Sequence, residues 1–413
     1  MREIIGSIDI GTDSIKLVVC EFYHNELNIL CGVDGVTKGF KDNEIVDEAA
    51  LIKSIKSVLE KAAVKLNFKI KKLIANIPTS INNFVVSEAT NTITSEEQRV
   101  TSNDILRVLQ STAYNKIKVG EELVGLVPIN FRVGDNETTD PFDKKGKNIT
   151  AKTVLITAPK KEVYDIIGIL EKCGVEVIDI STSSLACYYN FKNSDIDNRT
   201  GIIVNIGESK TSLSVFSKGI YINNEVLNTG GRFVDKDIAY MYKLKRNDSK
   251  YLKEALALAN ARRANPKESV KIVNKENEEL IINQYELTEI VASRVSEILK
   301  MIKKSINHLT KKEISYIIIT GGLTELKDFN IAMTSIFGEK AEIGIINTLG
   351  VRNNKYSVAL GIIRNFKEKL ALRHREYSTV GEAESELMVS SDSKISVPSD
   401  SILGKVFGYF FDN

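Results

Sequence analysis

Two segments of the chain repeat one pattern: SIDIGTDSIKLVV from Ser7 to Val19, and GIIVNIGESKTSLSVF from Gly201 to Phe216. Each copy has an apolar, β-branched run, a small polar turn that begins Ile-Gly, and a second apolar or alternating run. This pattern predicts a strand, a tight turn and a strand. Because internal repeats seldom arise without a shared architecture, the duplication predicts two related halves that each begin with a β-hairpin.

The first turn has the composition of a phosphate-binding hairpin but not of a P-loop. A P-loop passes from its glycines into a helix and carries a Gly-Lys-Ser/Thr ending, whereas Ile15 and Leu17 here continue a strand. Gly11 lets the backbone come close to a ligand, and the amides that follow it can form a concave anion site. Asp9 precedes the turn and is suited to holding Mg²⁺ through water. The candidate ligand-binding residues of this hairpin are Asp9, Gly11, Thr12, Asp13, Ser14 and Lys16.

Two such hairpins facing each other would hold a nucleoside polyphosphate from both sides. A pair of ordinary hairpins with polar turns has the same pattern, so a third element is needed. The segment YIIITGGLTELKDF, from Tyr316 to Phe329, predicts a buried strand that ends in Gly321 and Gly322 before a helix start. A diglycine at the carboxyl end of a strand lets adenine and ribose lie against bare backbone. In this order the elements resemble the actin and sugar-kinase superfamily.

A wider resemblance is carried by ELVGLVPINFRVGDNETTDPFDKKGKNITAKTVLITAPKKEVYDIIGILEKCGVEVIDISTSSLACYY and by a short amphipathic C-terminus. These segments resemble the bacterial cell-division family FtsA, from Met1 to about Arg373 with the tail added. The resemblance implies a two-lobed, duplicated α/β fold with an ATP cleft between the lobes, an inserted α/β subdomain, and an amphipathic helix on a flexible linker. It further implies ATP and Mg²⁺ as ligands, self-association into filaments, and binding to the FtsZ C-terminal peptide, other division proteins and membrane lipid. The implied location is the cytoplasmic face of the membrane at the division site.

The expected domains follow from these patterns. The core of the first lobe is expected at 1–84, 161–198 and 355–372, and the inserted subdomain at 85–160. The core of the second lobe is expected at 199–230 and 309–354, and its upper subdomain at 231–308. A linker at 373–398 and a membrane-targeting helix at 399–413 complete the chain.

The second hairpin departs from the usual superfamily pattern. Asn205 stands where an Asp is normal, and Glu208, Ser209 and Lys210 stand where small glycine-rich residues are common. Because Asn lacks the charge that holds Mg²⁺, and Lys210 can offset phosphate charge directly, we expect ATP to be bound with slow or absent hydrolysis. The candidate nucleotide residues of this half are Asn205, Gly207, Lys210, Thr211, Gly230, Gly231, Lys253, Gly321 and Gly322.

A second departure concerns the helix that we expect from Lys250, KYLKEALALANARRA. The resemblance places Gly230 and Gly231 near the ribose and phosphates and Lys253 beside the base. In FtsA proteins an acidic residue lies three positions before this lysine, but Lys250 stands there in this chain. The carboxylate that we would expect to contact the ribose hydroxyls is therefore absent at this position.

A long helix is predicted from Glu286 to His308, with one apolar stripe for the core and a basic opposite side. The basic side carries Arg294, Lys300, Lys303 and Lys304. Such a face could receive an acidic peptide, and the resemblance implies the FtsZ tail at the position of Arg294. A solvated helix face balanced by neighbouring glutamates is the alternative.

Composition limits the other possibilities. The 56 Lys and Arg nearly balance the 54 Asp and Glu, which gives no electrostatic footprint for nucleic acid. The 4 Cys have no metal-ligand spacing and are expected to be reduced core residues, and the 3 His are scattered. We find no signal-like N-terminus and no run of about 18 apolar residues, which favours a cytoplasmic protein or one attached to a membrane from that side.

The C-terminal segment SDSILGKVFGYFFDN forms one broad apolar arc at helical spacing. A terminal aromatic helix after a Ser- and Glu-rich tether is typical of a membrane interface, and docking onto the protein's own groove is the alternative. The arc contains Ile402, Leu403, Val406, Phe407, Tyr409, Phe410 and Phe411.

Two other classes of function fit parts of the sequence. The segment SIDIGTDSIKLVV also resembles the start of exopolyphosphatases, and sugar kinases share the expected fold, so a phosphotransfer enzyme is one alternative. It would need a carboxylate base, and the stretch from Gly134 to Lys147 offers only loop acids. A non-polymerising scaffold like the pilus-assembly relatives is the other, and it gives no reason for an amphipathic anchor.

Overall fold

The structure is a computed structural model that describes residues 3–23, 26–78 and 83–381. The chain forms two compact units. The first unit contains residues 1–191, 347–352 and 356–413, and the second contains residues 192–346 and 353–355. The expected helix at 399–413 lies outside the described residues, as does the part of the expected linker beyond Gly381.

The first unit is built on a five-stranded mixed sheet. Its strands, in spatial order, are β11 (Glu176–Thr182), β6 (Lys72–Ile77), β1 (Glu3–Ile10), β2 (Ser14–Tyr23) and β3 (Glu26–Val36). Strands β1, β2 and β3 pair antiparallel in sequence order, and β6 and β11 add in parallel. All eight residues of β1 are buried, as expected for a central strand covered on both faces.

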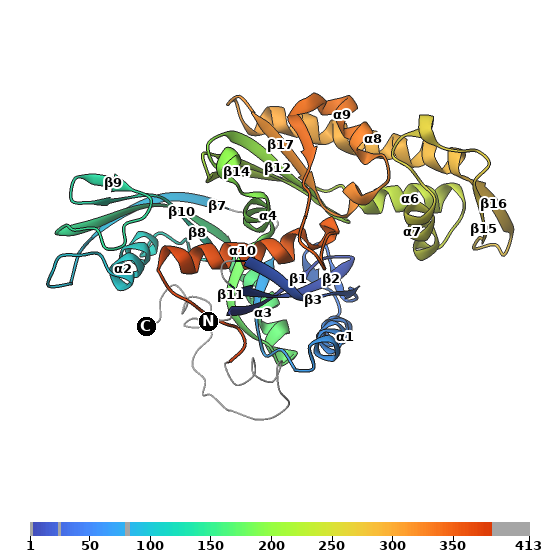
Figure 1. Ribbon diagram of the computed structural model, residues 1–413. Coiled ribbons are helices and arrows are strands. Elements are labelled where there is room, and N and C mark those ends of the chain that lie inside the picture. The colour runs from blue at the N-terminus through green and yellow to red at the C-terminus, as the bar shows by residue number, and fades with distance from the viewer. Residues whose placement is uncertain (1–2, 24–25, 79–82, 382–413) are drawn as a thin grey trace. The chain divides into compact units, whose positions relative to one another are not determined.

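Helices cover both faces of this sheet (Figure 1). The helices α1 (Glu48–Leu66) and α3 (Lys160–Lys172) contact each other, and α4 (Ser183–Phe191) contacts α10 (Ser357–Leu372) on the other side. Helix α1 begins because the Asp47 side chain accepts a hydrogen bond from the backbone of Ala50, and it ends where Asn67 takes a left-handed conformation. A short ribbon of β4 (Phe40–Lys41) and β5 (Glu44–Ile45) precedes α1.

An inserted α/β subdomain interrupts the first unit. Its antiparallel sheet has the order β7 (Asn83–Thr92), β10 (Asn148–Pro159), β8 (Glu121–Val133) and β9 (Asn136–Thr138). Helix α2 (Ser102–Ala113) packs on this sheet with its own apolar cluster around Ile105, Leu109 and Phe131. The helix begins with a reciprocal capping box between Thr101 and Asp104.

The chain after α10 returns to β1. The backbone amide of Thr379 donates to the carbonyl of Ile4 over 2.7 Å, and the side chain of Val380 is 4% exposed. The first residues of the segment that we expected to be a linker, up to Gly381, therefore pack on the edge of the first unit. The sequence showed no apolar periodicity here because the contacts are made mainly by Ser and Thr hydroxyls and by backbone.

The second unit repeats the topology of the first. Its five-stranded sheet has the order β14 (Ile220–Leu227), β13 (Thr211–Ser217), β12 (Thr200–Ile206), β17 (Tyr316–Thr320) and β18 (Ala341–Ile343). Three antiparallel strands in sequence order are again followed by two parallel additions. The duplication that the sequence predicts is thus a duplication of sheet topology.

The helices of the second unit are α5 (Ser194–Asp197), α6 (Gly231–Met241), α7 (Arg246–Ala255), α8 (Gln284–Leu309) and α9 (Phe329–Phe337). Short 3-10 turns lie at Ala261–Arg263, Gly322–Glu325, Gly338–Lys340 and Asn354–Tyr356. Helix α8 buries the predicted apolar stripe, including Leu287, Val291 and Ile302. A hairpin of β15 (Ser269–Val273) and β16 (Glu279–Asn283) lies at the end where α8 begins (Figure 1).

Helix α6 begins at Gly231, where the backbone amides of Gly231 and Arg232 donate to the Gly207 and Glu208 carbonyls of the second hairpin turn. Helix α7 spans Arg246–Ala255, whereas we expected a helix from Lys250 through Ala264. The apolar run after Ala255 instead contributes buried Leu256, Ala257 and Ala259 to the core in non-helical backbone.

The cysteines are free thiols, and Cys20, Cys31 and Cys187 are buried while Cys173 is partly buried. Burial raises the pKa of each of these thiols above its ordinary value. Within the described part of the chain, no helix is both long enough and apolar enough to cross a membrane.

Candidate functional site

The first hairpin closes tightly around its turn. Strands β1 and β2 pair in register up to Ile10 and Ile15, and the amide of Gly11 donates to the carbonyl of Ser14 over 3.1 Å. A Cβ atom at Gly11 would lie 2.9 Å from the Lys16 Nζ and 3.0 Å from the Ser14 carbonyl oxygen. Only glycine fits this turn without a shift of the Lys16 side chain or the Ser14 carbonyl.

Asp9 lies beside this turn and is 6% exposed. One carboxylate oxygen accepts from the Asn76 amide over 2.9 Å, and the other lies 3.3 Å from the Lys16 Nζ. Asn76 extends from β6, which pairs in parallel with β1. The structure therefore brings together Asp9, Lys16 and the turn, and adds Asn76, which the sequence analysis missed because it comes from a strand distant in sequence.

The second hairpin has the same backbone arrangement. Strands β12 and β13 pair up to Ile206 and Thr211, and the amide of Gly207 donates to the Lys210 carbonyl over 3.0 Å. Asn205 pairs with Ser212 across the hairpin and with Thr320 of the parallel strand β17. Asn205 thus occupies the position that Asp9 holds in the first unit.

Both diglycine segments of the second unit lie against this hairpin. A Cβ atom at Gly321 would approach the Ile206 carbonyl oxygen to 2.3 Å, and Gly321 has a φ of +100°. A Cβ atom at Gly230 would lie 2.4 Å from the Gly207 carbonyl oxygen, and the amide of Gly231 donates to the same oxygen over 2.9 Å. Only glycine allows these backbones to meet at the end of β12, where a cradle of bare backbone results.

Lys253 lies next to this cradle but is held by an acid that the sequence analysis did not consider. Its Nζ is 2.6 Å from a carboxylate oxygen of Asp235, which is 1% exposed. Burial raises the pKa of the Asp235 carboxyl above its ordinary value, and Lys253 only partly offsets this effect. A Cβ atom at Gly231 would lie 3.8 Å from the Lys253 Nζ, so the structure brings Lys253 close to the diglycine. Lys250 is 3.9 Å from Glu254.

Glu208, at the tip of the second turn, also has cationic neighbours. One of its carboxylate oxygens lies 2.5 Å from an Arg246 guanidinium nitrogen and 3.8 Å from the Arg232 Nε. Arg232 lies in α6, and Arg246 is the first residue of α7; both helices follow the second hairpin in sequence. The sequence shows Glu208 as an acid in a turn that otherwise favours phosphate. It does not show which arginines pair with Glu208.

The residues fit a nucleotide better than they fit a protein-bound metal. Glycine backbone, hairpin amides and the amines of Lys16 and Lys210 suit phosphate and ribose. No group of three or more His, Cys, Asp or Glu that could hold a metal ion occurs among the described residues. Asp9, the acid that we expected to hold Mg²⁺, offers one carboxylate, which would suit an ion bound mainly by water and substrate phosphates.

A separate surface surrounds Arg294 on α8. Its guanidinium makes two bonds to Asp237 of α6, over 2.5 and 3.0 Å, and one to Glu297. The hydrogen bond to Asp237 raises the pKa of Arg294 further above its ordinary value. A cavity of about 240 Å³ lies beside it, lined by Asp237, Tyr240, Met241, Ile290, Ser293, Arg294 and Glu297.

Tyr240 is 85% exposed and Met241 is 60% exposed, so this cavity has an apolar rim. The predicted basic face is divided. Lys300 and Lys304 are exposed, whereas Lys303 lines a different cavity and donates to the carbonyl of Ile336. The structure therefore groups Arg294 with apolar and acidic side chains of α6 rather than with Lys303.

Comparisons with known proteins agree with this geometry. The profile of the family described as "Cell division protein FtsA" matches residues 202–361, and the profile described as "SHS2 domain inserted in FTSA" matches residues 83–157. The FtsA protein of Bacillus subtilis is 25% identical over 396 residues, which cover 94% of this chain and 90% of that protein. The FtsA protein of Streptococcus pneumoniae is 25% identical over 358 residues, covering 86% and 78%.

The chain belongs to the FtsA family. It is an actin-like cell-division protein, as the resemblance of its two hairpins and its inserted segment predicted. The inserted sheet of β7, β10, β8 and β9 corresponds to the SHS2 domain of FtsA proteins.

Solved structures place this FtsA-family fold among actin-like proteins. A PilM–PilN type IV pilus biogenesis complex matches with a TM-score of 0.57 and 14% identity, over 87% of this chain and 97% of that chain. MreB5 of Spiroplasma citri bound to ADP matches with a TM-score of 0.53 and 13% identity, over 90% and 98%. At these identities the likeness concerns the fold, which confirms the predicted actin-like, duplicated architecture.

Proposed function

We propose that this FtsA-family chain binds ATP with Mg²⁺, self-associates into filaments and anchors FtsZ to the cytoplasmic face of the cell membrane at the division site. The observation that carries the nucleotide part is the repeated hairpin, with bare backbone at Gly11 in one unit and at Gly207, Gly230 and Gly321 in the other. The actin-like neighbour MreB5 bound to ADP gives independent support for a nucleotide ligand.

ATP hydrolysis is slow or absent in this proposal. Asn205 provides an amide at the position that Asp9 fills with a carboxylate in the other unit, so one charge that could hold Mg²⁺ and its water is missing. Losing such a group commonly costs about 2–4 kcal/mol of transition-state stabilisation. ATP then acts as a structural ligand that favours the conformation competent for polymer contacts.

The Arg294 cavity is the proposed site for the FtsZ C-terminal peptide. Its rim of Tyr240 and Met241 offers apolar contact, and Arg294 offers a guanidinium for a peptide carboxylate. Arg294 is already bonded to Asp237 and Glu297, so an incoming acid must compete with them. We therefore expect modest affinity that weakens as salt rises.

Membrane binding is assigned to Ser399–Asn413, outside the described residues. Seven apolar side chains on one arc and a single cation, Lys405, imply that burial of hydrocarbon and aromatic surface drives binding more than attraction to anionic lipid. One tail is expected to bind weakly, and a filament with many tails firmly, because each further tail engages at high effective concentration.

The test is one co-sedimentation series in which vesicles, ATP and an FtsZ tail peptide are varied independently. Phe407→Glu with Phe410→Glu should release the protein from vesicles and leave ATP affinity unchanged. Arg294→Glu should weaken binding of the FtsZ tail peptide by about 1–3 kcal/mol, while vesicle binding persists. Lys267→Glu, on an exposed loop of the same unit, is the matched control for charge reversal.

Each part of the proposal has its own contrary outcome. If the variant with Phe407→Glu and Phe410→Glu still floats with lipid at ordinary salt, the C-terminal helix is not the membrane anchor. If Arg294→Glu binds the peptide with unchanged affinity, the peptide binds at another site. Turnover near 1 per second or faster lies in the ordinary enzyme range and would support the phosphotransfer alternative instead.

A further inference from the structure

The first residue of α6, Gly231, is a glycine that the packing of the chain does not require. Its backbone is helical and buried, and a Cβ atom here would meet its neighbours only at ordinary van der Waals distances. At Gly230, by contrast, a Cβ atom would lie 2.4 Å from the Gly207 carbonyl oxygen. Alanine usually stabilises a protein at a position that allows it, because it restricts the unfolded chain. Gly231 therefore keeps a small space open at a cost in stability.

Atoms of both charges border this space. A Cβ atom at this position would lie 3.5 Å from a Glu208 carboxylate oxygen, 3.8 Å from the Lys253 Nζ and 3.9 Å from the Gly207 carbonyl oxygen. A phosphate oxygen that only accepts hydrogen bonds would face two further acceptors here. A hydroxyl group can donate to an acceptor and accept from an ammonium at the same time. The space therefore suits a hydroxyl group better than a phosphate oxygen.

The Glu208 carboxylate is held in place by a second element. One of its oxygens lies 2.5 Å from an Arg246 guanidinium nitrogen, and its other oxygen is the one that faces Gly231. The Glu208 carbonyl also accepts from the Arg232 amide over 2.7 Å, and the Glu208 side chain is 12% exposed. Because this side chain is already oriented, a ligand would gain an acceptor with little loss of conformational freedom.

Lys253 is oriented in the same way by Asp235. Its Nζ lies 2.6 Å from an Asp235 carboxylate oxygen, and the two side chains are 10% and 1% exposed. Asp235 follows Gly231 by four residues on α6, so it lies on the same face of the helix as the open space. An ammonium has three donors, so Lys253 can bond to a ligand while it keeps its pair with Asp235.

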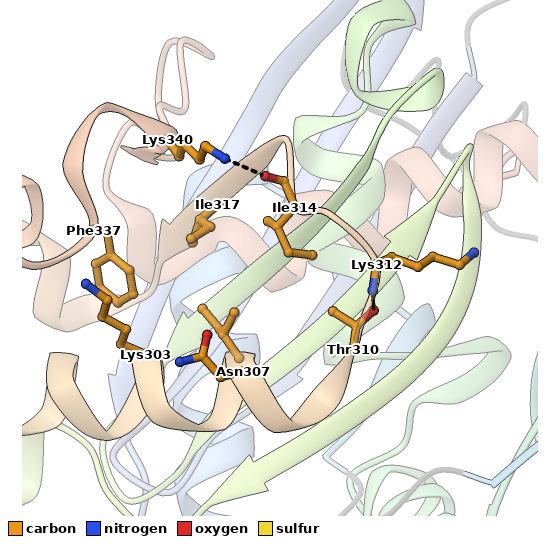
Figure 2. Close-up of a pocket in the computed structure, with 9 residues that line it drawn as sticks. Lys303, Asn307, Thr310, Lys312, Ile314, Ile317, Phe337 and Lys340 are labelled. Carbon is orange, nitrogen blue, oxygen red and sulfur yellow. Dashed lines mark hydrogen bonds between the residues drawn. The ribbon is translucent and has the colours of Figure 1, made fainter.

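The cavity of about 330 Å³ that is lined by α8 and α9 has a different chemistry. Its amines already stabilise the fold, because Lys303 donates to the Ile336 carbonyl and Lys340 donates to the Ile314 carbonyl (Figure 2). Among the described residues, the charged side chains that line it are Lys303, Lys312 and Lys340. Opposite charges that are fixed around one open space are thus a feature of the start of α6 and not of this cavity.

We propose that Glu208 and Lys253 bind the ribose hydroxyl groups of the nucleotide over Gly231 and so make the chain selective for ribonucleotides. Glu208 accepts from a hydroxyl group and Lys253 donates to one. Arg246 and Asp235 are positioning residues that hold these two side chains. These roles rest on the proposed binding of ATP and add the residues that distinguish one sugar from another.

The test compares ATP with 2′,3′-dideoxyATP by isothermal titration of the full chain in the presence of Mg²⁺. The unaltered chain should bind ATP about tenfold or more tightly than the analogue, because the analogue lacks both hydroxyl groups. Glu208→Gln should lower this preference to about threefold or less and leave the affinity for the analogue nearly unchanged. Arg246→Gln should also lower the preference, because the Glu208 side chain is then free to move. Glu254→Gln, at a side chain of α7 that is 62% exposed, is the control and should keep the full preference.

Gly231→Ala tests the open space itself. The added methyl group fits without a clash, so the melting temperature should stay the same or rise. The preference for ATP over the analogue should fall, because the methyl group occupies the place of a hydroxyl group. Gly168→Ala, at a second helical glycine with room for a Cβ atom, should leave the preference unchanged.

The contrary outcomes separate this site from the proposed function. If the unaltered chain binds ATP and 2′,3′-dideoxyATP equally, the ribose is not recognised here, although the proposed ATP binding stands. If Glu208→Gln weakens both nucleotides by the same factor, Glu208 holds the turn and not the sugar. A full preference for ATP in Gly231→Ala would mean that the sugar lies elsewhere. If neither nucleotide binds at millimolar concentration, the proposed nucleotide function fails and the ribose site fails with it.

Discussion

The two hairpins have one backbone and two different sets of charges. In both, the first turn glycine donates to the carbonyl three residues on, over 3.1 Å at Gly11 and 3.0 Å at Gly207. The same alignment places Asp9 opposite Lys16 in one hairpin and Asn205 opposite Ser212 in the other. The lysine of the second hairpin lies instead inside the turn, at Lys210.

The two hairpins therefore share a backbone conformation and differ in the charges of their side chains. Register and glycine set the backbone, because a Cβ at Gly11 or Gly207 would meet a carbonyl oxygen at about 3 Å. The side chains then decide the charge that each hairpin offers to a ligand. At the end of its first strand the first hairpin carries the Asp9 carboxylate beside Lys16, a carboxylate that would suit a metal ion, whereas the second hairpin carries the Asn205 amide there and has its lysine, Lys210, in the turn.

The largest expected effect comes from closing the backbone of one turn. Gly11→Val would place methyl groups where a Cβ already lies 2.9 Å from the Lys16 Nζ, so the phosphates are excluded and ATP affinity falls by more than about 100-fold. Gly207→Val should do the same if the two turns are equivalent. Isothermal titration with ATP measures both.

The control for these variants is Gly168→Ala, where an added Cβ meets nothing within 4 Å. It should bind ATP normally. If Gly11→Val binds ATP within threefold of the unaltered chain, the first turn is an ordinary hairpin and the equivalence of the two sites is lost.

The second prediction makes the first hairpin resemble the second. Asp9→Asn removes the carboxylate that we propose for Mg²⁺, and we expect the gain in ATP affinity on adding Mg²⁺ to fall by about ten- to thirtyfold, that is about 1.4–2 kcal/mol. The variant also leaves the partly buried Lys16 without its acid and should lower the free energy of unfolding.

ATP titrations with and without Mg²⁺ isolate the metal effect from the loss of stability. Asp42→Asn, in the exposed turn between β4 and β5, is the matched control. An unchanged response to Mg²⁺ in Asp9→Asn would mean that the metal is held without this hairpin.

Much of this comparison is readable in the sequence, because it rests on short-range patterns. The strand–turn–strand repeats, the diglycine after the Tyr316 strand and the apolar stripe of α8 follow from periodicity and turn composition. Helix α1 spans Glu48–Leu66, and both of its ends carry local signals, with Asp47 as the N-cap and Asn67 in a left-handed conformation at the C-cap.

The missing parts depend on contacts between distant segments. Asp235 pairs with Lys253, and Glu208 pairs with Arg246, through the packing of α6 and α7, which no spacing rule indicates. Arg294 was expected on a basic face, with neighbouring glutamates as the alternative partners; it pairs with Glu297 and also with Asp237 of a neighbouring helix. Charge partners across elements are set by tertiary packing, so the sequence identifies the ionic residues and not their pairs.

The third prediction makes the second hairpin resemble the first. Asn205→Asp restores a carboxylate at the end of β12, and turnover of ATP should rise by up to about tenfold if that charge limits hydrolysis. Phosphate release under saturating Mg²⁺ and ATP measures the change, and Asn205→Ser is the control that removes the amide without adding charge. A rate equal to that of Asn205→Ser would show that the slow step lies outside this position.

The smallest effect is expected at the lysine that only the second turn carries. Lys210→Gln keeps a polar side chain that is one atom shorter and removes one charge near the proposed phosphates, so ATP affinity should fall by about threefold, or about 0.7 kcal/mol, at low salt. Because an exposed ion pair is screened, the difference from the unaltered chain should vanish near 1 M salt. Ser14→Lys is the converse change in the first turn. If the two turn backbones are equivalent, it should raise ATP affinity by a similar factor. If Lys210→Gln weakens ATP equally at all salt concentrations, Lys210 holds the turn rather than the ligand, and the charge difference between the hairpins has a structural cause.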